Sequence, residues 1–73
     1  MSSSITEIAI QVNGTPQTCQ PHTLLPDLLT QLGLSPRLVA VEYNGEILHR
    51  QLWGQTELQS GDRLEIVTIV GGG

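Results

Sequence analysis

The nucleophilic and metal-ligating side chains of this 73-residue chain are few and scattered. They comprise one cysteine, Cys19, and two histidines, His22 and His49, and no two of the three have the spacing of a zinc site. The seven acidic residues stand singly, and no Ser-His-Asp or Cys-His arrangement is present. We therefore predict no catalytic residue, no metal site and no bound cofactor. Cys19 is interpreted as a small packed residue and both histidines as surface residues.

The glycine run at positions 71–73 suggests a different kind of chemistry. Gly71, Gly72 and Gly73 directly follow a strongly β-forming run, residues 66–70. Glycines have no side chains to pack and lose much entropy on ordering, so this run adds nothing to a core. A bare backbone can, however, pass through a narrow channel and bring a terminal carboxylate to ATP. Attack on the α-phosphate would give an acyl adenylate, which a sulfur or nitrogen nucleophile could capture. From composition alone, a frayed end or a cloning remnant is an equal interpretation.

Length and charge exclude several classes of function. Seventy-three residues allow one small domain without a deep catalytic cleft. The net charge is −4 and lysine is absent, which argues against nucleic acid or an anionic membrane as partner. No apolar stretch approaches the ~20 residues that span a bilayer, and residues 1–4 lack the features of a signal peptide. A single cysteine cannot form an intrachain disulfide, so we expect a cytoplasmic protein.

The turn signals divide the chain into short elements. Asn13-Gly14 and Asn44-Gly45 are strong hairpin signals, because both turn positions require positive φ. Together with alternating hydropathy, they predict strands over residues 5–12, 15–20, 38–43, 46–48 and 63–70. One helical turn is expected at 51–53, with Trp53 as a partial cap of the core.

One helix is predicted between the second and third strands. Thr23 is a suitable N-cap, Pro26 falls in the first turn, and Gly33 is placed to end the helix as its C′ residue. An apolar stripe is formed by Leu25, Leu28, Leu29 and Leu32. About ten residues cannot sustain a helix alone in water, so the stripe must pack on a sheet.

The resulting order is β-β-α-β-β-β, which predicts an α+β fold with one helix across a mixed sheet of about five strands. We expect a disordered lead at 1–4, a folded domain at 5–70 and a flexible tail at 71–73. Val67 and Ile69 should point to the face opposite Leu64 and Ile66, where an exposed apolar pair beside the tail would serve as a partner-docking patch. The predicted core consists of Ile8, Ile10, Val12, Leu28, Leu32, Val39, Val41, Leu64 and Ile66.

These features resemble the ubiquitin-like β-grasp sulfur carriers, and most of all the thiamin-biosynthesis carrier family, ThiS. The most specific likeness is the Gly-Gly end after a strand that begins through Ser60-Gly61-Asp62. Further likeness covers residues 5 to 73 almost throughout, namely Val12-Asn13-Gly14, Cys19, residues 23–29, residues 39–44, residues 46–48 and the ending 69–73. The family minimum is two glycines, so the resemblance assigns no role to the third.

The resemblance implies a protein cosubstrate rather than an enzyme. An adenylating enzyme would activate the Gly73 carboxylate with ATP, while Gly72 and Gly71 would occupy its channel as bare backbone. Sulfur from a cysteine desulfurase relay would convert the carboxylate to a thiocarboxylate. A thiazole synthase would then consume that sulfur to make the thiazole of thiamin.

Three alternatives remain open at this point. The related small-subunit-type carrier of molybdopterin synthase shares the fold and the tail. A ubiquitin-like protein modifier would use the same tail chemistry, although a chain without lysine cannot build isopeptide chains on itself. A plain interaction module with an incidental glycine run is the third.

Overall fold

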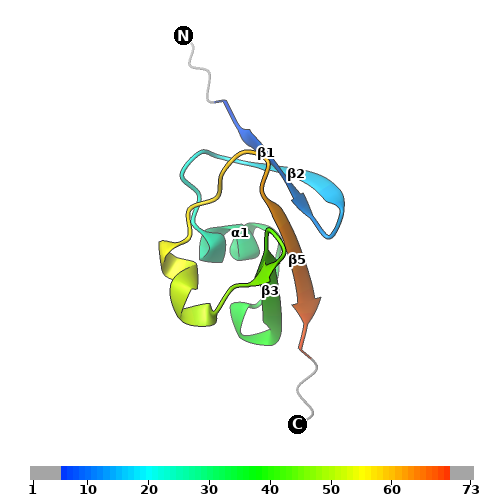
Figure 1. The fold of residues 1–73 in the computed structure, drawn as a ribbon. Coiled ribbons are helices and arrows are strands. Elements are labelled where there is room, and N and C mark those ends of the chain that lie inside the picture. The colour runs from blue at the N-terminus through cyan, green and yellow to red at the C-terminus, as the bar shows by residue number, and fades with distance from the viewer. Residues whose placement is uncertain (1–5, 70–73) are drawn as a thin grey trace.

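The computed structural model describes residues 6–69. The five strands are β1 (Ile8–Val12), β2 (Thr15–Cys19), β3 (Val39–Tyr43), β4 (Glu46–Ile47) and β5 (Arg63–Thr68). One α-helix, α1 (Leu25–Gln31), and two 3-10 helices, η1 (Pro36–Leu38) and η2 (Arg50–Gln55), complete the described chain. In Figure 1 the chain enters the sheet at β1 and leaves it at the opposite end of β5, with α1 and η2 on one side of the sheet.

The sheet has the order β2-β1-β5-β3-β4. β1 and β5 are parallel neighbours, with Val12 level with Leu64, and the other pairings are antiparallel. A central parallel pair made by the first and last strands, with one helix packed across the sheet, is the arrangement of the β-grasp fold, so the predicted fold class is confirmed. The strands are shorter than expected at several ends: β5 stops at Thr68, and residue 38 belongs to η1.

Both Asn-Gly pairs form the predicted hairpin turns. Asn13 and Asn44 each have φ of 52°, followed by Gly14 at 80° and Gly45 at 90°. The Asn13 side chain also extends the β1–β5 pairing. Its Nδ2 donates to the Ile66 carbonyl at 3.1 Å, and its Oδ1 accepts from the Ile66 N–H at 2.7 Å. A side chain thereby takes the place of one further β1 residue beside β5.

The helix begins one residue later than its predicted cap. Leu24 occupies the N-cap position and no side chain caps the helix. The assignment of Thr23 as N-cap was wrong, because its hydroxyl donates instead to the Gln20 carbonyl at 2.6 Å. The C-terminus follows the prediction. Gly33 has φ of 77°, its N–H reaches the Thr30 carbonyl at 3.0 Å, and the next N–H, of Leu34, reaches Leu29 at 2.9 Å. These two bonds form a Schellman motif.

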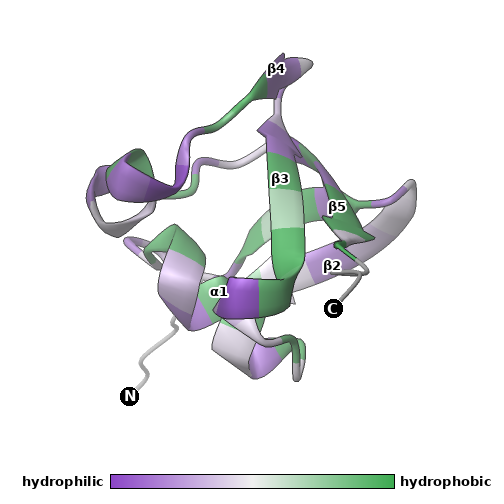
Figure 2. Ribbon diagram, turned by 90° about the horizontal axis from the view of Figure 1, so that it is seen from below, coloured by the Kyte–Doolittle hydropathy of each residue, from purple (hydrophilic) through white to green (hydrophobic). Residues whose placement is uncertain are grey.

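The core lies between α1 and the sheet. Seven of the nine predicted core residues are buried, whereas Ile8 and Leu32 are only partly buried and pack against its edge. Trp53 is 4% exposed, so it belongs to the core itself and is more than a partial cap. Its Nε1 donates to the Leu48 carbonyl at 2.9 Å. Hydrophobic segments run along β3 and β5 and through α1 in Figure 2. The remaining buried apolar residues are Cys19, Leu25, Leu29 and Leu58.

Candidate functional site

β5 is the strand that leads to the glycine run, and its two faces differ as predicted. Leu64 and Ile66 are buried at 1% and 7% exposure. Val67 and Ile69 are 58% and 44% exposed. Val67 points to the face opposite Leu64 and Ile66, because side chains alternate along a strand. Ile69 follows one residue after β5, and its N–H donates to the Leu38 carbonyl at 2.6 Å, so the pairing with the β3 side continues and Ile69 shares this outer face. An apolar surface is thus available to a partner immediately before the tail.

A third apolar residue joins this surface from β4. Ile47 is 70% exposed and lies opposite Glu42 in the β3–β4 register, which places both on the outer face. A hollow of about 200 Å³ is lined by Ala40, Val41, Glu42, Ile47, Glu65 and Val67. We call Ile47, Val67 and Ile69 the outer-face patch. Sequence reasoning missed Ile47, although its position three residues after Asn44 in a tight hairpin was a usable signal.

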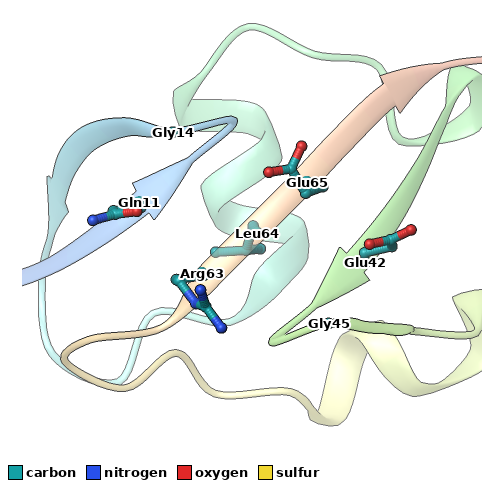
Figure 3. Close-up of a pocket in the computed structure, with 7 residues that line it drawn as sticks. All are labelled: Gln11, Gly14, Glu42, Gly45, Arg63, Leu64 and Glu65. Carbon is teal, nitrogen blue, oxygen red and sulfur yellow. The ribbon is translucent and has the colours of Figure 1, made fainter.

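Two carboxylates separate this apolar hollow from a polar one. Glu42 and Glu65 lie directly opposite each other on β3 and β5 and are both exposed. They also line a second hollow of about 210 Å³, together with Gln11, Gly14, Gly45, Arg63 and Leu64. Figure 3 shows the Arg63 side chain directed away from Glu65. Across residues 6–69, no ion pair joins Arg63 to either carboxylate.

Asp62 organises the turn from which β5 starts. It is 7% exposed and accepts hydrogen bonds from the Tyr43 hydroxyl, from Asn44 Nδ2 at 3.2 Å and from the Gln59 N–H at 2.7 Å. Burial, and then the hydrogen bond and the charge of Asp62, raise the pKa of Tyr43 to about 12. The turn was predicted, but its buried carboxylate was not. This network fixes the start of β5 against β3 and so holds the register of the outer face.

The remaining candidate side chains lie apart from this surface. Cys19 is 2% exposed, and burial is the main cause that raises the pKa of its thiol, which disfavours the reactive thiolate. His22 is exposed and its Nδ1 lies 2.6 Å from Glu57 Oε2. His49 is exposed at the start of η2. Within the described residues, no three His, Cys, Asp or Glu side chains are grouped as around a metal ion.

The predicted reactive residues Gly71, Gly72 and Gly73 lie outside the described residues, as does the predicted lead at 1–4. Of the predicted site, the structure therefore describes Val67 and Ile69 alone. Among residues 6–69, no helix is long and apolar enough to cross a membrane.

Comparison with known families identifies this arrangement. The model of the ThiS family matches residues 10–73, a range that includes the whole of β2 to β5 and the glycine run. The chain belongs to the ThiS family. This membership places it among the ubiquitin-like sulfur carriers of thiamin biosynthesis.

Individual relatives agree with the ThiS assignment. A crystal structure of the thiamine biosynthesis protein ThiS from Geobacter metallireducens superposes with a TM-score of 0.78 at 33% identity, covering 90% of this chain and 100% of that one. The sulfur carrier protein ThiS of Bacillus subtilis is 37% identical over 65 residues, 88% of this chain and 98% of its own length. A thiazole synthase of Magnetococcus marinus is 41% identical over 64 residues, which are 88% of this chain but 20% of that protein.

Proposed function

We propose that Gly73 carries sulfur as a C-terminal thiocarboxylate for the synthesis of the thiazole of thiamin. The observation that supports this best is the extent of the ThiS match, which reaches residue 73 and so takes in all three glycines after β5.

The proposed chemistry proceeds at the terminal carboxyl group. An adenylating enzyme binds ATP, and a Gly73 carboxylate oxygen attacks the α-phosphate, so that pyrophosphate leaves and an acyl adenylate remains. A sulfur nucleophile then attacks the carbonyl carbon and AMP leaves. Where the sulfur arrives as a persulfide from a cysteine desulfurase relay, a thiol reduces the resulting acyl disulfide and releases the thiocarboxylate. Gly71 and Gly72 supply a backbone without Cβ atoms to the enzyme's channel.

The proposed recipient of the sulfur is a thiazole synthase. A segment 41% identical to this chain occurs within a protein named thiazole synthase, which supports a functional link between the carrier and that enzyme. The outer-face patch offers both enzymes an apolar docking surface next to the reactive end, so that binding energy is available close to the chemistry. The matches to thiamin proteins favour this pathway over the molybdopterin alternative.

Intact-mass spectrometry tests the proposal. The chain is incubated with ATP, the source organism's adenylating enzyme and a sulfur donor. The wild type should gain the mass of one oxygen-to-sulfur exchange, located in its C-terminal peptide. Gly72→Val, or one residue added after Gly73, should abolish the exchange without changing the melting temperature, because neither change touches the core. Sulfur found on Cys19, or normal thiolation of the extended chain, would contradict the proposal.

A further inference from the structure

The facing carboxylates of Glu42 and Glu65 are an unfavourable arrangement for the isolated chain. The two residues are directly opposite in the antiparallel β3–β5 register, and like charges in this position destabilise a sheet. Both side chains are exposed on the outer face. Arg63 stands two residues before Glu65 on the same strand, yet its guanidinium is turned away in Figure 3. Nothing within residues 6–69 neutralises the pair through an ion pair.

The surroundings of the pair have the features of a binding surface. The carboxylates form one edge of the apolar hollow that Ala40, Ile47 and Val67 line. An apolar centre beside charged groups is a common composition of protein interfaces. Two adjacent carboxylates present four acceptor oxygens, which match the planar fork of donors on an arginine side chain.

We propose that Glu42 and Glu65 jointly bind one arginine of the adenylating enzyme, while an apolar side chain of the same enzyme fills the hollow between Ile47 and Val67. This inference rests on the proposed function, since it assigns a recognition site to the enzyme that activates Gly73. A cation held between the carboxylates removes their mutual repulsion only in the complex. The pair thus favours the bound state over the free state and makes association depend on ionic strength.

A second copy of this chain is a poorer occupant of the site. The chain has a net charge of −4 and no lysine, so two copies repel each other on approach. A partner enzyme with a basic residue meets no such barrier. Of the two enzymes proposed to bind the chain, the adenylating enzyme acts first on Gly73, and it is the occupant to test.

The test compares the free energy of unfolding with the affinity for the enzyme. Glu42→Gln, Glu65→Gln and the double variant remove the repulsion while keeping the side-chain size. Each should leave the chain as stable as the wild type or more stable in urea titrations. Each single variant should bind the adenylating enzyme about tenfold more weakly, and the double variant should lose most of the salt dependence of binding. Glu46→Gln is the matched control, because it removes the same charge from a residue paired with Tyr43, outside this pair.

The result that overturns the inference is equally specific. Affinities of the Glu42 and Glu65 variants equal to those of the Glu46 control would do so, as would a self-associated wild type whose dimer dissociates in the double variant. Failure of the proposed function is distinguishable, since the wild-type chain would then gain no sulfur at all. If the wild type is thiolated and the variants bind normally, the inference about the pair alone is wrong.

Discussion

Tyr43 makes the stability of the fold sensitive to alkaline pH. The chain has one tyrosine, one cysteine and no lysine, so Tyr43 and Cys19 are the side chains that lose protons in this range. The pKa of Tyr43 is raised from 10.0 to about 12 by burial and by Asp62. A raised pKa means that the folded state holds the proton more tightly than the unfolded state. The stabilisation is therefore complete below pH 10 and lost as the pH rises towards 12.

We predict that the free energy of unfolding of the wild type falls between pH 10 and 12, by about 1–2 kcal/mol for this shift at a partly exposed side chain. Tyr43→Phe should be less stable at pH 8, because it loses the hydrogen bond to Asp62, but should show a shallower fall above pH 10. Cys19 also has a raised pKa, and because it is present in both proteins it lowers the free energy of unfolding of both equally at alkaline pH. Urea unfolding at intervals of half a pH unit measures both curves. Parallel curves up to pH 12 would refute this role of Tyr43.

Among the elements, α1 shows which signals a short sequence can carry. Its C-terminus was predictable because Gly33 supplies the required positive φ by itself. Its N-terminus was not, because Leu24 forms a bridge with Glu57, a residue 33 positions later. The hydroxyl of Thr23 meanwhile closes its own local turn. Local chemistry therefore predicted one end of the helix, and a tertiary contact decided the other.

Gly33 and Gly54 provide a matched pair for testing that C-terminal signal. Neither has an atom within 4 Å of the position of an added Cβ, but Gly33 has φ of 77°, whereas Gly54 does not lie in the positive region. Gly33→Ala should lower the free energy of unfolding by about 1–2 kcal/mol, since an L-residue is strained there. Gly54→Ala should change it by less than about 0.5 kcal/mol. Thermal unfolding followed by circular dichroism measures both, and equal losses would show that space rather than backbone conformation matters.

The candidate site, like α1, has parts that local sequence signals predict and parts that they do not. Exposure of Val67 and Ile69 was predictable because a strand alternates with a period of two, and buried Leu64 and Ile66 fix the phase. The place of Ile47 was also within reach of the sequence, because the tight Asn44-Gly45 turn fixes the register of β3 against β4. The position of Glu42 opposite Glu65 depends instead on the register between β3 and β5, which no hairpin joins, so no local pattern contains it.

At the scale of the whole molecule, stability and docking should be separable. Leu28 is fully buried between helix and sheet, and replacing it with alanine should cost about 2–5 kcal/mol. In a domain of this size that is a large share of the total stability. The variant should therefore lose thiocarboxylate yield in proportion to its unfolded fraction. Urea titration and intact mass on the same sample check this, and a stable variant with low yield would contradict it.

Ile69→Asp is the opposite case. The side chain is 44% exposed on the outer-face patch, so its loss should change the free energy of unfolding by less than about 1 kcal/mol. An introduced carboxylate should nevertheless weaken binding to the adenylating enzyme by about tenfold or more, because it places a charge in an apolar contact. Calorimetric titration measures the affinity. Binding at the wild-type level would remove Ile69 from the docking surface.

The parallel pairing of β1 with β5 also governs how this carrier can be handled in the laboratory. Val12 is level with Leu64, and the two strands run the same way, so Ile8 and Thr68 stand eight residue steps apart along the sheet. At ~3.3 Å per residue this is roughly 26 Å. An affinity tag, fluorophore or solid support attached before β1 is thus joined at the end of the sheet opposite to the end of β5. Immobilisation from that side leaves the outer-face patch open to enzymes that approach the glycine run.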